Sequence, residues 1–350
     1  MNGENRSRAE IEREMVLSTF YHGLGPIRQW LDDDSVTEIM VNPGGKVFVE
    51  SSGEIAYKGE LFTEEIIKTA LQGAAKFNRK DMLMDSASSI VNASIDNLRI
   101  SGAQAPVSPK GSFITIRKHM DASHRPSLEE LVTDKQALTQ DQADLLVELI
   151  VNRRYNCIFA GGTGSGKTTL INAVLAKIPH YERVISVEDA KELEIKVPNS
   201  FPIITNPDIG ITARLAIQTL LRQRPDRIIL GETRGDETYD LIRALNSGHP
   251  GSMTSIHANS ALDALDSLQM LYQMSLPANA SISTESARHF ISRVVHLVVY
   301  VDRHVKEVDG RYLVLRGVAE ICLVKGVDRQ GRFVLEDVTT QEKDHAVEVR

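Results

Sequence analysis

Residues 161–168 read GGTGSGKT, which fits the pattern G-x-x-x-x-G-K-[ST]. The apolar run YNCIFA precedes this segment, and KTTLINAVLAKI, which has the apolar spacing of a helix, follows it. Glycines in such a turn let backbone N–H groups converge on an anion without Cβ clashes, and the helix N-terminus adds a favourable dipole. The flanking strand and helix disfavour a chance match. The segment therefore predicts a strand–loop–helix unit that binds phosphate groups.

The polar side chains of this loop have predicted roles at a nucleotide. Lys167 is expected to reach the β- and γ-phosphates, and the hydroxyl of Thr168 is expected to bind Mg²⁺. The residues predicted to bind the nucleotide are Gly161, Gly162, Thr163, Gly164, Ser165, Gly166, Lys167, Thr168 and Thr169.

Two further apolar runs end in carboxylates. RIILGE (227–232) ends in Glu232, which we predict to face Mg²⁺ and the attacking water, with a surface carboxylate as the alternative. RVISVED (183–189) ends in Glu188 and Asp189, and we favour Glu188 to orient or polarise the water. Both would serve equally well to cap a helix over AKELEI.

A pair of histidines lies in the polar stretch GHPGSMTSIHAN (248–259). We predict that His257, at the end of the strand MTSIHA, hydrogen-bonds the γ-phosphate and reports its loss. A zinc site is disfavoured, since zinc takes four protein ligands, or three and water, and the only cysteines lie elsewhere in the sequence. His249 is expected to be structural or solvent-facing.

The length of 350 residues favours two domains. Residues 1–118 combine short strands and helices and predict an α+β domain, with strands at 38–42, 46–50, 54–59, 98–107 and 112–119. Residues 119–139 are polar and are interpreted as a linker with one helical turn. Residues 140–338 alternate helix and strand, which predicts a parallel sheet covered on both faces, and the runs at 296–303, 312–324 and 332–338 are expected to finish it as antiparallel strands. The tail, 339–350, has no pattern and is expected to be disordered.

Composition limits the classes of function. The net charge of −7 and pI of about 5.8 do not favour binding to nucleic acid. Cys157 and Cys322 lie in apolar runs, as buried free thiols of a reducing compartment do. No apolar run approaches the ~18 residues of a membrane span, and the charged N-terminus lacks the apolar region of a signal peptide. We expect a cytoplasmic protein that meets a membrane only through partners.

Four segments together resemble a known family, the secretion ATPases of type II and type IV systems. GGTGSGKTT, VISVEDAKELEI, LLRQRPDRIILGETRGDE and GHPGSMTSIHANSALDAL correspond in order and spacing to its Walker A, Asp box, Walker B and His box. SVTEIMVNPGGKVFVE and FITIRKH are also similar, so the resemblance covers about residues 25–338. The sequence looks most like the hexameric traffic ATPases of conjugative and effector type IV secretion.

The resemblance implies an α/β fold in which a smaller α+β N-terminal domain joins a RecA-like P-loop NTPase domain, assembled as a homohexamer. It implies ATP and Mg²⁺ as cofactors, ATP hydrolysis, and action at the cytoplasmic face of the inner membrane with inner-membrane components of the machine. By position, Arg99 and Arg117 would bind the phosphates, as guanidinium groups suit a transferring phosphoryl group. Arg222 is a further candidate, within the subunit or across the ring. The family usually has Asp-Gly-x-Arg where this chain has Asp96-Asn97-Leu98-Arg99, and Asn97 is expected to tolerate the left-handed turn.

Several alternatives stay open at this point. Type II relatives often carry a four-cysteine zinc module that two cysteines cannot build, whereas pilus assembly or retraction motors share all four boxes. A ring scaffold that binds nucleotide without hydrolysis is a second class, and a RecA-like DNA motor is a third, disfavoured by the negative charge. The transported substrate is not identified by the sequence.

Overall fold

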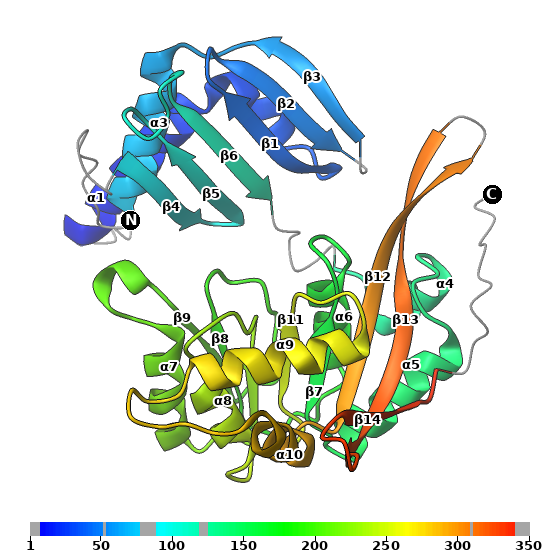
Figure 1. Cartoon of the computed structure of the whole chain (residues 1–350). Helices are drawn as coiled ribbons and strands as arrows, with labels where there is room; N and C mark the ends of the chain where they lie inside the picture. The colour runs from blue at the N-terminus through cyan, green and yellow to red at the C-terminus, as the bar shows by residue number, and fades with distance from the viewer. Residues whose placement is uncertain (1–7, 52–53, 78–88, 119–124, 309–310, 340–350) are drawn as a thin grey trace, which may run out of the picture. The chain divides into compact units, whose positions relative to one another are not determined.

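The computed structural model describes residues 8–51, 54–77, 89–118, 125–308 and 311–339 (Figure 1). The chain divides into two compact units, Met1–Asp121 and Ala122–Arg350. Most of the tail expected to be disordered, 340–350, lies outside the described residues, as does the start of the expected linker, 119–124.

The first unit is an antiparallel six-stranded sheet with helices on one face. Its strand order is β3-β2-β1-β6-β5-β4. The elements are α1 (Arg8–Gly23), η1 (Gly25–Ile27), α2 (Arg28–Leu31), β1 (Val36–Asn42), β2 (Lys46–Ser51), β3 (Glu54–Glu60), α3 (Glu64–Phe77), β4 (Ile90–Ile95), β5 (Leu98–Ala103) and β6 (Phe113–Lys118). Side chains from α1 and α3, such as Phe20 and Leu71, form one core with alternate residues of the strands, such as Ile39 and Ile116. The strand β4 is absent from the sequence prediction.

The turn between β4 and β5 differs in detail from the prediction. Ile95 pairs with Leu98, so Asp96 and Asn97 alone make the turn. The left-handed residue is Asp96, at φ 52, rather than Asn97. The carboxylate of Asp96 accepts a hydrogen bond of 2.7 Å from the hydroxyl of Tyr21. The tight turn therefore forms without the family's glycine, through a neighbouring residue.

The second unit is an eight-stranded sheet in the order β14-β13-β12-β7-β11-β10-β8-β9. The strands from β12 to β9 are parallel, and β13 and β14 add antiparallel pairs at one edge. The strands are β7 (Cys157–Ala160), β8 (Val184–Glu188), β9 (Ser200–Ile204), β10 (Arg227–Leu230), β11 (Met253–Ile256), β12 (Leu297–Val308), β13 (Arg311–Val327) and β14 (Phe333–Asp337). The helices are α4 (Leu128–Thr133), α5 (Gln140–Leu146), its π-helical continuation η4 (Val147–Asn152), α6 (Lys167–Leu175), η5 (Pro207–Ile209), α7 (Ala213–Leu220), η6 (Leu221–Gln223), α8 (Thr238–Leu245), α9 (Ala261–Met274) and α10 (Thr284–Val294).

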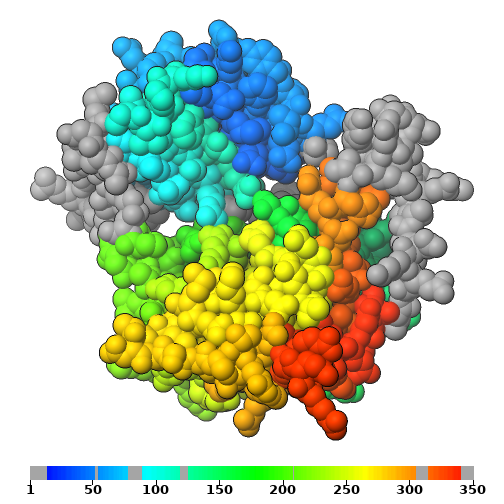
Figure 2. Space-filling model, in the orientation of Figure 1, coloured from blue at the N-terminus to red at the C-terminus, as the bar shows by residue number. Residues whose placement is uncertain are grey.

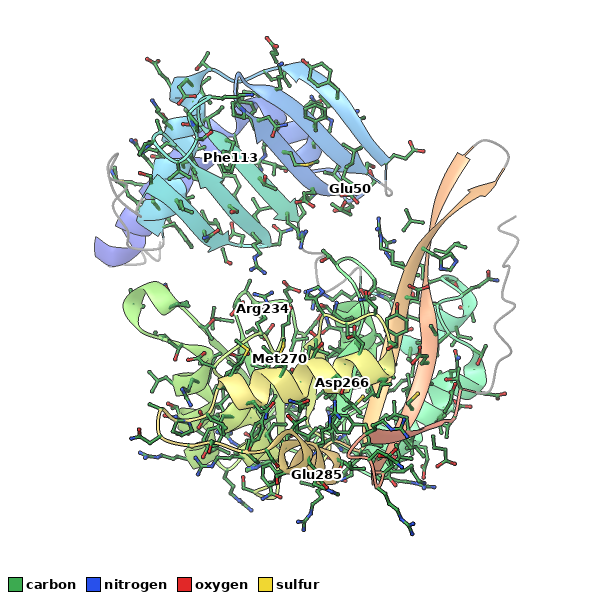
Figure 3. The ribbon with its side chains drawn as sticks, in the orientation of Figure 1. Glu50, Phe113, Arg234, Asp266, Met270 and Glu285 are labelled. Atoms are coloured by element: carbon green, nitrogen blue, oxygen red, sulfur yellow. The ribbon has the colours of Figure 1, made fainter. Side chains whose placement is uncertain are left out.

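Helices cover both faces of this sheet, because alternate residues of its central strands point to opposite sides. Cys157 and Phe159 of β7 pack with α5 and α6, whereas Ile158 and Ala160 pack with α9 and α10. A further cluster joins α7 and α8 to β8 and β10. Helix α9 also forms part of the surface in Figure 2, and Figure 3 labels Met270 and Asp266 on it.

The sequence analysis interpreted residues 125–139 as part of a linker. In the structure they pack into the second unit instead. Ser127 and Glu130 form a reciprocal capping box that starts α4. Leu128, Leu131 and Leu138 are buried in the core beneath the sheet. Leu128 and Leu131 have the i, i+3 spacing of one helical turn, but Leu138 lies apart from them beyond a polar segment, so a core common to all three is not evident from periodicity.

Strands β12 and β13 form a hairpin that runs well past the sheet. Strand β12 pairs with β7 only over Leu297–Tyr300, whereas β12 and β13 continue to pair from Asp302 and Gly317 to Val308 and Arg311 (Figure 1, orange). The sequence predicted only 296–303 for the first of these strands.

A buried ion pair lies at the start of β10, where Arg227 is the first residue of the strand. Arg227 is fully buried; its Nε lies 2.6 Å and its Nη2 3.0 Å from the Glu182 carboxylate oxygens. The same guanidinium donates to the carbonyl groups of Ile150 and Val151 at the end of η4. Gly251, at φ +79, passes beside it, and a Cβ there would lie 2.3 Å from Nη1 of Arg227.

Candidate functional site

The predicted strand–loop–helix unit around residues 161–168 is present. Strand β7 is buried along its whole length and leads into a loop that ends where α6 begins at Lys167. Gly161 must be glycine because a Cβ there would lie 2.4 Å from the Val301 carbonyl oxygen and 2.6 Å from Ser165 Oγ. Gly166 takes φ +101 immediately before the helix. Ser165 Oγ is one of the buried polar atoms that lack a hydrogen-bond partner in the described part of the chain.

The ammonium group of Lys167 lies inside this loop. It donates hydrogen bonds to the carbonyl oxygens of Gly161 (2.7 Å) and Gly162 (2.8 Å). Burial lowers the pKa of Lys167, and the nearby carboxylate of Glu232 opposes that shift. The cation therefore stands between the phosphate loop and the carboxylate on β10.

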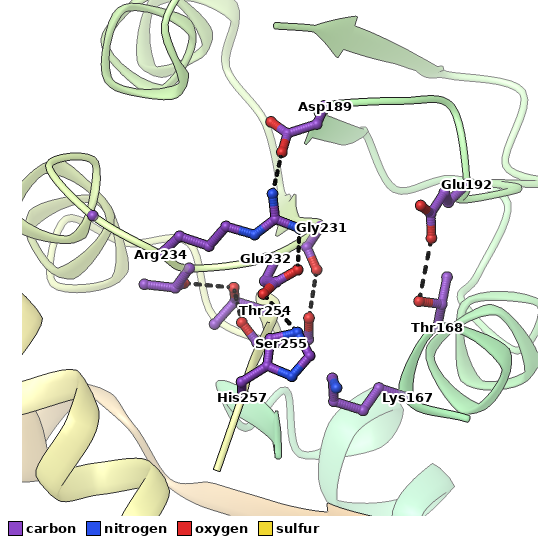
Figure 4. A network of polar contacts seen from close by, with 12 residues as sticks. Lys167, Thr168, Asp189, Glu192, Gly231, Glu232, Arg234, Thr254, Ser255 and His257 are labelled. Carbon is purple, nitrogen blue, oxygen red and sulfur yellow. Dashed lines mark hydrogen bonds and ion pairs between the residues drawn. The ribbon is translucent and has the colours of Figure 1, made fainter. Parts of the chain in front are cut away.

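The carboxylate of Glu232 is held from two sides at the ends of neighbouring parallel strands. Glu232 follows β10, and His257 follows β11. His257 Nε2 lies 3.0 Å from Glu232 Oε1, and Arg234 Nη2 lies 2.5 Å from Glu232 Oε2 (Figure 4). The structure thus brings Lys167, Glu232 and His257 to one edge of the sheet.

His257 is neutral at neutral pH. Burial lowers its pKa below the ordinary 6.5, and the positive charges of Lys167 and Arg234 act in the same direction. The carboxylate of Glu232 opposes them. A neutral imidazole of this kind can donate one hydrogen bond and accept another, which suits contact with a phosphate and with a carboxylate at once.

Arg234 is a site residue that the sequence analysis missed. Its guanidinium bridges Glu232 to Asp189 Oδ2, at 2.7 Å, across the ends of β10 and β8 (Figure 4). Glu232 and Arg234 are two residues apart in the segment GETR, which directly follows β10, and their side chains form an ion pair. This arginine so close to the predicted carboxylate was the signal in the sequence.

Glu188 has partners within its own loop. It is 4% exposed; Oε1 accepts from the Ser186 hydroxyl (2.7 Å), and Oε2 accepts from the backbone N–H groups of Glu192 (2.8 Å) and Leu193 (2.7 Å). Burial raises its pKa, and these hydrogen bonds oppose the rise. The prediction of a helix over AKELEI is wrong, because residues 190–197 are not helical. Glu188 instead organises a loop.

That loop delivers another carboxylate that the sequence analysis did not single out. Thr168 Oγ1 lies 3.5 Å from Glu192 Oε2 (Figure 4). Asn172 of α6 fixes the same loop, donating to the carbonyl of Glu192 and accepting from the N–H of Glu194. The hydroxyl expected to bind Mg²⁺ is thus flanked by an acidic side chain.

The donor set suits Mg²⁺ better than a metal held by protein ligands alone. Among the described residues, no group of three or more His, Cys, Asp or Glu side chains is arranged to hold a metal ion. Mg²⁺ at nucleotide sites takes one or two protein oxygens, with phosphate oxygens and water completing its octahedron. Thr168, Glu192 and Glu232 offer oxygens of the required kind.

The remaining candidates lie away from this edge or in the first unit. Arg99 and Arg117 are directly opposite on β5 and β6, and Arg117 Nη2 lies 3.5 Å from Glu38 Oε2 on β1. Arg222 is exposed in η6. His249 Nδ1 lies 2.9 Å from the carbonyl oxygen of Ala244 at the end of α8, before β11 begins. Its contacts are those of a structural residue.

Comparisons with known proteins agree with this arrangement. Residues 21–349 match the family model of type II/IV secretion system proteins. The conjugal transfer protein TrbB of Rhizobium radiobacter is 32% identical over 322 residues, covering 91% of this chain and 92% of that protein. The type IV secretion system protein VirB11 of Brucella abortus is 31% identical over 336 residues, covering 87% and 91%.

The fold is shared with solved structures. The ATPase DotB of Legionella pneumophila aligns with a TM-score of 0.59 at 16% identity, over 95% of this chain and 84% of that one. The expected fold class, a RecA-like P-loop NTPase domain joined to a smaller α+β domain, is confirmed. None of the helices in the described ranges is long and apolar enough to cross a membrane.

Proposed function

Since the chain belongs to the family of type II/IV secretion system proteins, we propose that it is a hexameric ATPase of type IV secretion or conjugative transfer. ATP binding and hydrolysis drive domain motion that powers pilus assembly or substrate translocation. It acts at the cytoplasmic face of the inner membrane, bound to membrane components of the machine. The relatives named for conjugal transfer and for type IV secretion support this assignment over a type II system.

The contact between His257 and Glu232 beside Lys167 carries the proposal of hydrolysis. A phosphate-binding loop alone indicates only a nucleotide binder. Here a carboxylate with two donors at 3.0 Å and 2.5 Å stands next to the lysine that the motif assigns to the β- and γ-phosphates. Such a carboxylate can orient water and accept its proton as the bond to the γ-phosphoryl group breaks. A scaffold that only binds nucleotide has no use for it.

Each residue has a role in the proposed reaction. Backbone N–H groups of residues 161–169 hold the phosphates, and Lys167 leaves the loop carbonyls to bind the β- and γ-phosphates. Thr168 and Glu232 would hold Mg²⁺, and the ion would neutralise charge on the phosphates. Glu232 takes the proton of the attacking water. His257 reads whether a γ-phosphate is present.

The two arginines of the first unit couple chemistry to motion in this proposal. Arg99 and Arg117 would bind phosphate oxygens when ATP is present and release them after hydrolysis. Their position side by side on neighbouring strands supports a joint role, because two guanidinium groups in register can bind one anion together.

A phosphate-release assay on the purified full chain tests the proposal. Mg²⁺- and ATP-dependent release that is lost in Lys167→Ala supports the ATPase. Nucleotide binding with no release by wild type would instead favour the non-hydrolysing scaffold. Native mass measurement with nucleotide tests the hexamer. A pilus assembly or retraction motor is the second candidate, and complementation of conjugation against twitching motility in deletion strains separates the two.

A further inference from the structure

The β12–β13 hairpin lies beside three glycines of the phosphate loop. The carbonyl oxygen of Val301 on β12 closes against Gly161. A Cβ built on Gly164 would lie 4.0 Å from Cδ and Nε of Arg303, and one on Gly166 would lie 4.0 Å from Cδ of Arg316. The hairpin thus lies against the phosphate loop.

One of these contacts is a directed hydrogen bond. Nε of Arg316 donates to the carbonyl oxygen of Gly164 at 2.7 Å. Gly164 has φ +69, which lies in the left-handed region. Glycine adopts this region about as readily as the right-handed one, so its own preference does not fix the orientation of the peptide after it. A charged donor bound to this carbonyl selects that orientation. The N–H of Ser165, the other half of the same peptide, donates to the carbonyl oxygen of Gly162 at 3.4 Å, so the turn of the loop is held at both ends of this peptide.

The two arginines form one structural unit. Arg303 and Arg316 are paired directly across β12 and β13. Arg303 is exposed, and among the residues that the structure describes its guanidinium has no hydrogen-bond or ion-pair partner. Its stem nevertheless packs along Gly164. The hairpin therefore places its arginine pair over one turn of the loop, anchored by Arg316.

We propose that the β12–β13 hairpin is a built-in support of the phosphate loop, and that Arg316 is a positioning residue for the nucleotide. By fixing the Gly164–Ser165 peptide, Arg316 pre-organises the N–H groups that bind the α- and β-phosphates. This lowers the cost of ordering the loop when nucleotide binds. The inference rests on the proposed function only in requiring that the loop binds a nucleotide.

The expected effect is on affinity rather than on the chemical step. Hydrogen bonds with a charged donor are stronger than neutral ones. Without this bond the free loop is less ordered, so part of the binding free energy of the nucleotide is used to order it. We expect Arg316→Met to raise the Kd for ADP and for a non-hydrolysable ATP analogue about tenfold, equivalent to about 1.4 kcal/mol. Both nucleotides are affected equally because both carry α- and β-phosphates. The kcat at saturating ATP should stay within about threefold of wild type.

The experiment uses the full chain and a matched control. Arg329→Met removes another exposed arginine at the far end of β13, in the turn before β14, and should leave both Kd values unchanged. Hydrogen exchange without nucleotide gives a second readout: amides of residues 161–168 should exchange faster in Arg316→Met than in Arg329→Met. A loss of folding would instead reduce the active fraction at unchanged KM, and a thermal melt would detect it.

The outcomes are distinct. Raised Kd values for both nucleotides, with faster exchange in the loop, support the proposal. Equal Kd values and equal exchange in Arg316→Met and wild type overturn it, as does a loss of kcat at unchanged Kd. A wild-type chain that binds no nucleotide would overturn the proposed function itself.

Discussion

The exchange Glu232→Gln tests which carboxylate serves the attacking water. Glutamine keeps the shape of the side chain and removes its charge and its ability to take a proton. The side chain is 18% exposed and contacts His257 at 3.0 Å, so a same-sized amide can occupy the same place. Catalysis by a positioned base contributes typically about 10²–10⁴-fold. We therefore expect kcat to fall by that factor, or roughly 3–5 kcal/mol in the barrier.

The same exchange should barely affect folding. Arg234 is 49% exposed, so its ion pair with Glu232 is screened by water and is worth about 0–1 kcal/mol. For a domain of roughly 150–250 residues, that corresponds to a shift of at most about 2–4 °C in Tm. A large loss of kcat with a small change in Tm is the combination that marks a catalytic residue. Asp236→Asn, which removes an exposed carboxylate from the same loop, is the matched control and should change neither.

The companion exchange, Glu188→Gln, should behave differently. The amide oxygen can accept from the N–H groups of Glu192 and Leu193, and its NH₂ group can donate to Ser186, whose hydroxyl then reverses its role. We expect a loss of about 1–2 kcal/mol in stability as charge-assisted bonds become neutral, and a kcat within about tenfold of wild type. Steady-state phosphate release and a thermal melt measure both. If Glu188→Gln abolishes turnover and Glu232→Gln retains it, the assignment is refuted.

Three further outcomes follow from the site. Lys167→Ala should lower ATP turnover by about 10³-fold or more while leaving the melting curve intact; near-normal phosphate release would contradict its role. Because the pKa of His257 is lowered, the imidazole stays neutral down to pH values below 6.5, and turnover should fall only under that pH as it protonates; His257→Gln should remove this acid limb from the pH–rate profile while nucleotide still binds. The free energy of unfolding should also decrease as pH falls below 6.5, because His257 takes up a proton less readily in the folded state than in the unfolded chain. Changing Arg99 and Arg117 together to Ala should leave the oligomer but abolish the compaction that a non-hydrolysable ATP analogue causes in small-angle scattering; equal compaction in wild type and variant would show that they are not the latch.

The sequence predicted the site residues best where the order of the strands along the chain determines which residues lie together. Glu232 and His257 end consecutive strands of a parallel sheet, so their proximity follows from the order of the strands alone. Glu188 was identified at the right strand end, but its hydrogen bonds to residues 192 and 193 depend on a loop conformation that no periodicity encodes. Glu192 reaches Thr168 through that same loop, which explains why it was missed.

Contacts between distant segments were the other gap. Residues 125–139 were interpreted as a linker because their leucines are buried only by strands and helices that follow later in the chain. The hairpin was predicted too short, and its arginine beside Gly164 is 152 residues away in sequence. An exposed arginine on a strand carries no mark of such a contact. Only the folded structure, in which Arg316 Nε donates to the carbonyl oxygen of Gly164, shows it.

The buried ion pair between Arg227 and Glu182 restricts how this chain can change over evolutionary time. Losing Glu182 leaves the buried Arg227 guanidinium without its ion pair, at a cost of about 3–5 kcal/mol, comparable to much of a domain's stability, and losing Arg227 leaves Glu182 with only its 3.4 Å ion pair to Arg154. A side chain at Gly251 would strike the same guanidinium. Among relatives, we therefore expect positions 182 and 227 to lose their charges together, and residue 251 to gain a side chain only after the arginine has gone. At this end of the sheet, we expect functional relatives to differ by paired substitutions rather than by single ones.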